Sequence, residues 1–211
     1  ETGQATGFIP CGFIELAADA DRLEEYRRIT NFNRLHGNVI DELSPGEVKQ
    51  LFPLVNVDNI LAGFYAANDG RINPVDVTMA LAKGARMHGV KFHEGVRVEG
   101  FDMVEGRITA VNTNLGKIAC EKVVNCAGMW AHELGARAGT TIPLHAAEHF
   151  YIVTEPMPGL SSSMPVLRDP DGCAYFKEDA GKLLVGWFEP VAKPWGMRGI
   201  PETFCFDQLP D

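Results

Sequence analysis

Hydrophobic residues recur at helical spacing in three stretches of this chain, and a typical capping residue precedes each stretch. The first begins near Asp21: Leu23, Tyr26, Ile29 and then Asn33 recur at three- and four-residue spacing, and Asp19 or Asp21 could cap the helix. In the second, Ser44 and Glu47 have the spacing of a capping box, in which each side chain accepts the other residue's backbone N–H. Asn73 is followed by proline at the first helical position, which predicts a third helix that ends at Gly89.

The hydrophobic pattern changes from helical spacing to alternation near residue 90. Val90–His93 predicts a short strand that completes the second half of a βαβ unit. Three β-rich runs follow, separated by glycine turns at Glu105-Gly106 and Asn114-Leu115-Gly116, which predicts a three-stranded antiparallel meander. The last run, Lys122–Gly128, leads into helical residues. A buried strand that ends at glycine before a helix is a place where backbone amides meet a ligand.

The chain becomes β-rich again after Pro143. Residues 150–154 predict a strand, and the runs 174–176 and 182–187 predict a hairpin around Asp179-Ala180-Gly181. The whole pattern predicts a mixed α/β (α+β) fold.

The composition narrows the function class. Hydrophobic residues make up 45% and charged residues 22%, which is typical of a globular protein. The net charge of −9 argues against nucleic-acid binding, because an acidic surface repels phosphate. No signal peptide and no transmembrane segment is expected. Five cysteines without a C-x-x-C pair favour a reducing compartment, so the protein is not expected to be secreted.

Several sequence motifs for cofactor binding and catalysis are absent. The chain has no G-x-G-x-x-G, no P-loop, no H-E-x-x-H and no G-x-S-x-G. By itself, this chain therefore lacks the glycine loop that cradles a dinucleotide pyrophosphate. The run that ends at Gly128 has two interpretations: a common buried strand before a turn, or a strand end where glycine lets a cofactor approach the backbone.

Two histidines and a tyrosine are candidates for chemistry. On a helix, His145 and His149 would face one way and could hold zinc, but the sequence favours a strand, no third ligand is evident, and no metal is expected. On a strand, His149 and Tyr151 share one face and could orient a substrate or move a proton. Spacing alone favours the simpler alternative, a core histidine and an interface aromatic.

Two arginines could hold a substrate carboxylate. Arg71 lies in a turn that feeds the third helix, and a solvated turn arginine is the preferred interpretation of it. Arg168 could pair with Asp169 or be free to meet a carboxylate. The spacing does not decide between these two alternatives.

Taken together, these motifs resemble the flavin-dependent amine oxidoreductases of the D-amino-acid-oxidase type, and sarcosine and dimethylglycine dehydrogenases in particular. The segments that carry the resemblance run along nearly the whole chain: Gly7-Phe8-Ile9, Leu51–Asp58, Asp69-Gly70 with Asn73-Pro74, Val124–Ala131, His149–Glu155, Pro165–Asp169 and Gly186-Trp187-Phe188-Glu189. The resemblance implies an FAD enzyme that oxidises the CH–NH bond of a small N-methylated amino acid. Because the glycine loop of the family precedes the matched region, we expect this chain to be a central fragment that is inactive alone.

The resemblance also implies a domain layout and a set of site residues. Residues 71–141 would belong to a Rossmann-like FAD domain that includes the meander, while residues 1–70 and 142–211 would belong to a mixed β-sheet substrate domain. The implied cofactor contacts are Val96, Ala127, Gly128 and Trp130. The implied catalytic residues, which face the flavin and the substrate, are His149, Tyr151 and Arg168.

Other implied properties depend on parts outside this chain. An electron acceptor and folate are possible partners there, and the expected compartment is the bacterial cytoplasm or the mitochondrial matrix. Residues 143–151 also resemble the regulatory subunit of pyruvate dehydrogenase phosphatase, which shares the fold without being a dedicated dehydrogenase. We favour the dehydrogenase because most members of this fold are oxidoreductases.

Overall fold

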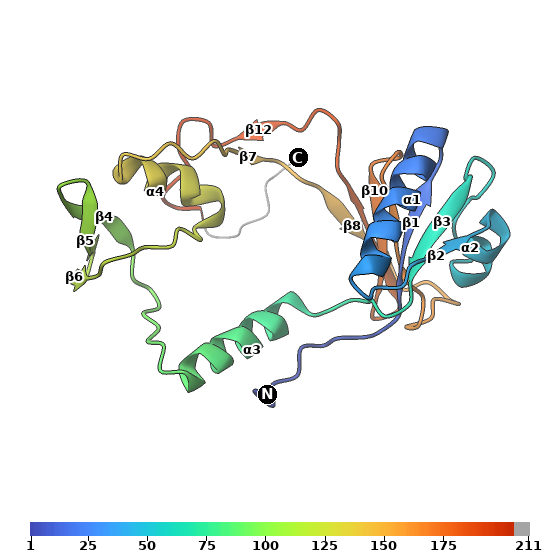
Figure 1. The fold of residues 1–211 in the computed structure, drawn as a ribbon, viewed down its shortest axis with the longest axis horizontal. Helices are drawn as coiled ribbons and strands as arrows, with labels where there is room; N and C mark the ends of the chain where they lie inside the picture. The colour runs from blue at the N-terminus through green and yellow to red at the C-terminus, as the bar shows by residue number, and fades with distance from the viewer. Residues whose placement is uncertain (205–211) are drawn as a thin grey trace. The chain divides into compact units, whose positions relative to one another are not determined.

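The computed structural model describes residues 1–204. Its helices and strands are, in chain order, β1 Phe13–Ala17, α1 Ala20–Leu35, β2 Asp41–Leu43, α2 Pro45–Leu51, β3 Ala62–Ala66, α3 Pro74–Met87, β4 Val98–Val104, β5 Arg107–Thr113, β6 Gly116–Ala119, the 3-10 helix η1 Gly128–Trp130, α4 Ala131–Arg137, β7 Ala146–Ala147, β8 Tyr151–Val153, β9 Val166–Asp169, β10 Ala174–Asp179, β11 Lys182–Trp187 and β12 Pro194–Trp195 (Figure 1). Within this range, every helix is too short or too polar to span a bilayer.

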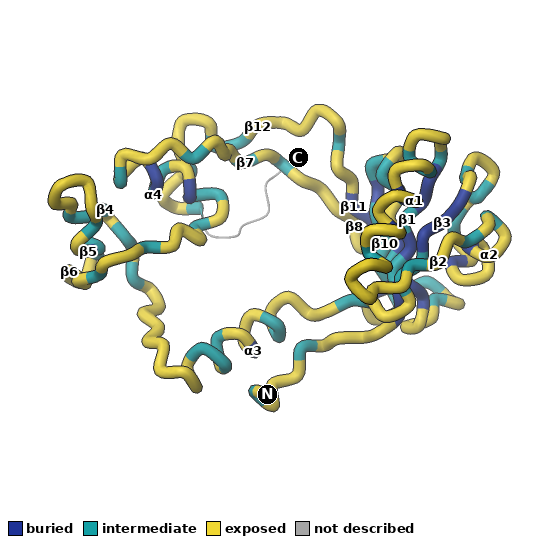
Figure 2. The backbone as a smooth tube through the Cα atoms, viewed as in Figure 1, coloured by how far each residue is buried: buried dark blue, intermediate teal, exposed yellow. Residues whose placement is uncertain are grey.

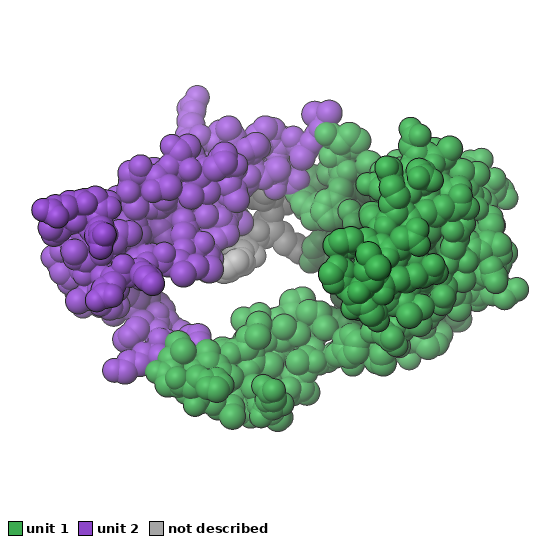
Figure 3. Space-filling model, in the orientation of Figure 1, with its two compact units in different colours: residues 1–90, 149–190 green, residues 91–148, 191–211 purple. Residues whose placement is uncertain are grey.

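The chain folds into two compact units (Figure 3). Among the described residues, the first contains 1–90 and 149–190, and the second contains 91–148 and 191–204. The assignment of chain segments to an FAD domain and a substrate domain stays a prediction.

The first unit is built on one seven-stranded sheet with the order β2-β3-β1-β9-β10-β11-β8. The pairing of β1 with β9 is parallel and every other pairing is antiparallel, so the sheet is mixed. Helix α1, strand β2 and helix α2 lie between β1 and β3 in the sequence, and β3 pairs with the edge of β1 opposite β9. Strands β1 and β9, which are far apart in the sequence, lie side by side near the centre of the sheet.

Alternation along β1 separates the two faces of this sheet. Ile14 and Leu16 point into the main core, where they pack with Leu167 of β9 and Val48 of α2, all of them almost completely buried (Figure 2). On the other face, Tyr26 of α1 packs against β1 and β3 through a small cluster with Ala17, Ala62 and Phe64. Helix α1 therefore covers the β1–β3 part of this second face.

The predicted helix starts are confirmed. Asp19 caps α1 by accepting the Arg22 N–H at 2.8 Å. Ser44 and Glu47 form both bonds of the capping box at α2. Asn73 caps α3 through its side-chain oxygen, and the helix ends next to Gly89, which has a φ of +83°.

The predicted hairpin turns are also confirmed. Glu105-Gly106 joins β4 to β5, and Ala180-Gly181 joins β10 to β11. All four residues have positive φ, from 49° to 80°, which suits a two-residue turn whose twist matches that of the flanking strands. Strands β4, β5 and β6 form the predicted antiparallel meander in the second unit.

Two predicted strands are wrong. Val90–His93 has no strand pairing, and the third strand of the meander is Gly116–Ala119 rather than Lys122–Gly128. The two-residue turn at Asn114-Leu115 folds the chain back at once, so β6 forms directly after it. Residues 122–127 find no neighbouring strand within 1–204, and Val124 is 84% exposed. Strand propensity alone does not form a strand without a pairing partner.

Arg71 is not the solvated turn arginine that the sequence favoured. Its side chain is 9% exposed and pairs with Glu178 of β10, whose side chain is 4% exposed. The Gly181 amide also donates to Glu178, at 2.7 Å. Burial alone would raise the pKa of Glu178, but the Gly181 amide and Arg71 outweigh it and hold that pKa below the ordinary value. The pair thus ties the 69–71 turn to the β10–β11 hairpin.

Replacing one partner of this buried pair should strongly destabilise the protein. We expect Arg71→Met to lower the free energy of unfolding by about 3–5 kcal/mol, because it leaves the Glu178 carboxylate buried without its counter-charge. Adding Glu178→Leu to that variant should recover most of the loss. Arg28→Met, which removes the exposed pair with Glu24, is the matched control and should scarcely change stability. Urea denaturation measures all four proteins, and equal losses at Arg71 and Arg28 would contradict the prediction.

Candidate functional site

A row of side chains crosses the seven-stranded sheet of the first unit in register. Tyr151 of β8 pairs with Gly186 of β11, which pairs with Tyr175 of β10. Tyr175 pairs with Arg168 of β9, and Arg168 pairs with Glu15 of β1. Directly opposed residues of neighbouring strands point to the same face. The row therefore lies on the face that α1 covers at the β1–β3 end.

Gly186 makes room for the ring of Tyr175. A Cβ atom at position 186 would lie 2.1–2.3 Å from three atoms of the Tyr175 ring and hydroxyl, far inside van der Waals contact. The ring therefore lies across the glycine. Glycine in the interior of a strand weakens the sheet, and here the close approach of this ring accounts for it.

The Tyr175 hydroxyl approaches the imidazole of His149. Tyr175 Oη lies 3.4 Å from His149 Nε2, and the imidazole stacks on Phe188 with ring centroids 4.4 Å apart and planes at 17°. Burial raises the pKa of Tyr175, and the neighbouring Tyr151 raises it further. Tyr175 thus stays protonated at neutral pH and can donate a hydrogen bond.

Arg168 is paired, but not with the residue considered from the sequence. Its Nη1 donates to Oε1 of Glu15 at 3.2 Å, while Asp169 instead accepts the Gly172 N–H at 3.0 Å. The Arg168 side chain remains 50% exposed, so part of its guanidinium faces solvent. Neither sequence alternative, a pair with Asp169 or a free arginine, describes it.

The structure therefore brings three of the residues considered from the sequence to one region of the first unit. Tyr151 and Arg168 lie in the row, and His149 contacts it through Tyr175. Sequence reasoning missed Tyr175, Gly186 and Glu15. The signal for the first two was present: a glycine inside an otherwise regular strand, with an aromatic residue at the position that a tight hairpin places opposite to it.

The cofactor contacts implied by the resemblance all lie in the second unit. Gly128 begins η1 with a φ of +54° and has no atom within 4 Å of where a Cβ would be. Asn125 shapes the loop before it, accepting the Ala127 N–H at 3.2 Å and donating to the Ala131 carbonyl at 3.0 Å. Trp130 ends η1, and Val96 lies in the segment before β4. The cofactor-binding role of these residues stays a prediction.

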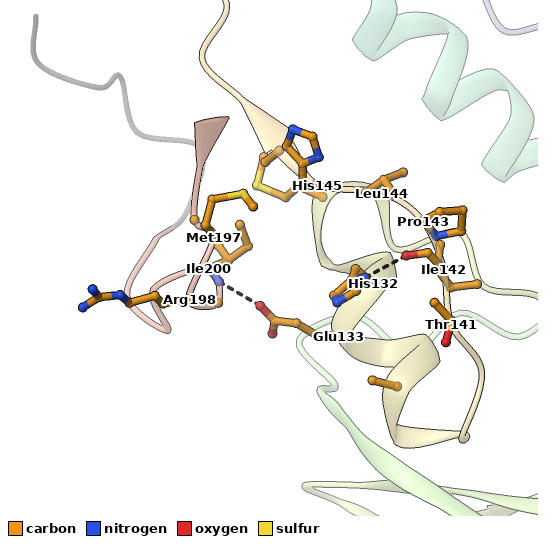
Figure 4. Close-up of a pocket in the computed structure, with 15 residues that line it drawn as sticks. His132, Glu133, Thr141, Ile142, Pro143, Leu144, His145, Met197, Arg198 and Ile200 are labelled. Carbon is orange, nitrogen blue, oxygen red and sulfur yellow. Dashed lines mark hydrogen bonds between the residues drawn. The ribbon is translucent and has the colours of Figure 1, made fainter. Parts of the chain in front are cut away.

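The second unit also contains an open pocket of about 920 Å³ (Figure 4). Helix α4 lines it together with residues 141–146 and 196–200. The imidazole of His132 is fixed by a 2.7 Å hydrogen bond between Nδ1 and the Ile142 carbonyl, and Glu133 accepts the Ile200 N–H at 2.8 Å. Sequence reasoning did not indicate this pocket. In residues 1–204, no group of three or more histidine, cysteine or acidic side chains could hold a metal ion.

Comparison with known families decides the broad class of the chain. The profile of the family described as "FAD dependent oxidoreductase" matches residues 1–204. The chain belongs to the FAD-dependent oxidoreductase family.

Curated relatives in this family include two kinds of dehydrogenase and one regulator. The chain is 36% identical to mouse sarcosine dehydrogenase over 98% of its length and 36% identical to rat dimethylglycine dehydrogenase over 97% of its length. It is 39% identical to the mouse pyruvate dehydrogenase phosphatase regulatory subunit over 92% of its length. The chain covers 23%, 25% and 22% of these proteins, respectively, so it spans about a quarter of the relatives it matches.

Solved structures in this family confirm the predicted fold class. L-proline dehydrogenase from P. horikoshii aligns with a TM-score of 0.75 and 27% identity, over 86% of this chain and 49% of that one. Glycine oxidase from Geobacillus kaustophilus aligns with a TM-score of 0.70 and 26% identity, over 92% of this chain and 50% of that one.

The residues present are compatible with part of a site for FAD, the cofactor of this family. Gly128 leaves open space beside the backbone, where a planar group can approach. The exposed row offers phenols and a guanidinium, which suit a small molecule with a carboxylate. The pyrophosphate of FAD normally rests on a glycine-rich loop, and the sequence has no such motif.

Substituting Gly186 should disturb the row through Tyr175. We expect Gly186→Ala to destabilise the protein by about 1–3 kcal/mol, because the new methyl group and the tyrosine ring cannot occupy the same space. In a Tyr175→Ala background the same substitution should be nearly neutral. Gly100→Ala in β4, where a Cβ has no atom within 4 Å, is the control. Thermal unfolding measures these variants, and an equal cost of Gly186→Ala in both backgrounds would disprove the steric explanation.

Proposed function

We propose that this chain is the central part of a longer FAD-dependent oxidoreductase that oxidises the CH–NH bond of a small N-methylated amino acid such as sarcosine or dimethylglycine. The supporting observation is the in-register row of Tyr151, Tyr175 and Arg168 on an exposed part of the sheet, with His149 beside it. The similarity to sarcosine and dimethylglycine dehydrogenases along nearly the whole chain agrees with this substrate class.

Each residue of the row has a role in this proposal. Arg168 holds the substrate carboxylate through the N–H groups on the exposed part of its guanidinium. Tyr151 and Tyr175 orient the substrate through their hydroxyls. His149 Nε2 takes up the proton that the substrate nitrogen must lose before oxidation, by way of the Tyr175 hydroxyl at 3.4 Å.

The same proposal assigns part of the cofactor site to the second unit. Val96, Ala127, Gly128 and Trp130 would hold part of FAD, whose chemistry is to accept the hydride from the carbon next to the substrate nitrogen. The rest of the cofactor would be bound by segments outside residues 1–211. In this scheme residues 71–141 belong to the FAD domain, and residues 1–70 and 142–211 belong to the substrate domain.

The proposal extends to the partners and the compartment. An electron acceptor and folate would act through segments outside this chain. The mitochondrial matrix or the bacterial cytoplasm is the proposed compartment, since the relatives include mitochondrial proteins and one from Paenarthrobacter nicotinovorans.

The chain alone should not retain FAD. Without a glycine-rich loop, the pyrophosphate lacks its cradle of backbone amides. Purified residues 1–211 should be colourless, whereas the full-length gene product should be yellow. The visible absorbance of bound flavin, relative to the absorbance of the protein, measures this. One bound flavin per isolated chain would contradict the prediction.

The proposed reaction predicts substrate-dependent reduction of the flavin. Without oxygen, sarcosine or dimethylglycine should bleach the yellow band of the full-length protein in a single turnover. Arg168→Glu should abolish this reduction, because a second carboxylate repels the substrate carboxylate, and should leave reduction by dithionite intact. A spectrophotometer under anaerobic conditions records both reactions, and glycine without the N-methyl group serves as the control substrate.

The alternative is a regulatory subunit without this activity. The 39% identity to the pyruvate dehydrogenase phosphatase regulatory subunit supports it. A regulator would leave the flavin oxidised with every N-methylated amino acid tested and would change the activity of a partner phosphatase. That combination of results would replace the dehydrogenase proposal.

A further inference from the structure

The guanidinium that the proposed function assigns to the substrate already has a counter-charge inside the protein. Arg168 Nη1 donates to Glu15 Oε1 at 3.2 Å. The parallel pairing of β1 with β9 places these two residues directly opposite each other on one face, so the contact follows from the register of the sheet. An arginine has five N–H donors, and this pair engages a donor on Nη1.

Helix α1 places a buried tyrosine beside Glu15. Tyr26 is 6% exposed, and its ring packs on Phe64, the residue of β3 paired with Glu15. Burial raises the pKa of Tyr26, and the charge of the adjacent Glu15 carboxylate raises it further. Tyr26 is thus a neutral phenol beside Glu15. The carboxylate lies between the buried phenol and the half-exposed guanidinium, with a side chain that is only 21% exposed.

We propose that Glu15 is a positioning residue that fixes Arg168 in the row and limits how tightly Arg168 binds a substrate carboxylate. This inference rests on the proposed role of Arg168. A bound carboxylate must share the guanidinium with Glu15, so the internal pair competes electrostatically with the ligand. Removing the charge of Glu15 without changing its size leaves Arg168 with a net positive charge and strengthens carboxylate binding.

The test uses the full-length protein and two probes of nearly equal size. Methoxyacetate carries the carboxylate of a small substrate, whereas methoxyacetamide lacks the charge. Isothermal titration calorimetry measures their binding to the wild type and to the Glu15→Gln, Arg168→Gln and double variants. Glu42→Gln is the matched control. Glu42 of β2 lies opposite Phe64 of β3, which in turn lies opposite Glu15, so Glu42 is on the same face of the sheet but away from Arg168. Its carboxylate pairs with Arg27 at 2.6 Å.

We expect Glu15→Gln to tighten methoxyacetate binding about two- to fivefold, the scale of a partly exposed ion pair. Methoxyacetamide binding should stay unchanged, as should binding of both probes to Glu42→Gln. In the Arg168→Gln background, Glu15→Gln should have no effect. With sarcosine, Glu15→Gln should lower KM by the same factor and leave kcat unchanged, because Glu15 does not touch the reacting atoms.

The outcomes separate this inference from the proposed function. If Arg168→Gln weakens methoxyacetate binding but Glu15→Gln does not tighten it, the role of Glu15 is wrong and that of Arg168 stands. If Arg168→Gln changes nothing, the carboxylate-holding role of Arg168 fails, and the inference fails with it. Should Glu15→Gln not fold, Glu15→Asp replaces it. The shorter carboxylate weakens the contact with Arg168, so binding that is tighter than wild type supports the proposal and unchanged binding overturns it.

Discussion

The parallel pairing of β1 with β9 is the contact on which the first unit depends. It joins two segments that would otherwise be separate antiparallel groups, β2-β3-β1 and β9-β10-β11-β8. On one face this pairing brings Ile14 and Leu167 together in the main core, and on the other it brings Glu15 next to Arg168. One register therefore determines both the packing of the core and the electrostatics of the exposed row. A slip of β1 by one residue would turn Glu15 toward the core and away from Arg168, and would turn Ile14 out of the core.

Much of the local structure could be predicted from the sequence because its causes are local. The capping residues Asp19, Ser44 and Asn73 and the glycine turns act over a few positions, and the structure bears them out. The strand predictions for segments 90–93 and 122–128 were wrong because strand pairing depends on distant residues. A strand needs a neighbour, and the identity of that neighbour is not contained in the alternation of a single run.

The candidate site shows the same division between local and long-range causes. His149, Tyr151 and Arg168 were candidates because of their residue types and their family resemblance. The partners that define their chemistry, Glu15 and Tyr175, are set by strand order and register. Arg71 is the extreme case: its turn sequence suggests solvent, yet the hairpin that contains Glu178 folds over it. No local signal at Arg71 indicates that contact.

The central pairing also has a consequence for the order in which this protein folds during synthesis. Glu15 and Arg168 are separated by 153 residues. Strands β1, β2 and β3 and helix α1 leave the ribosome early and can pair with one another, but Ile14 and Leu16 lack the β9 side of their core until residue 167 has been made. At about 5–20 residues per second, this leaves the β9 side of that apolar face uncovered for about 8–30 seconds.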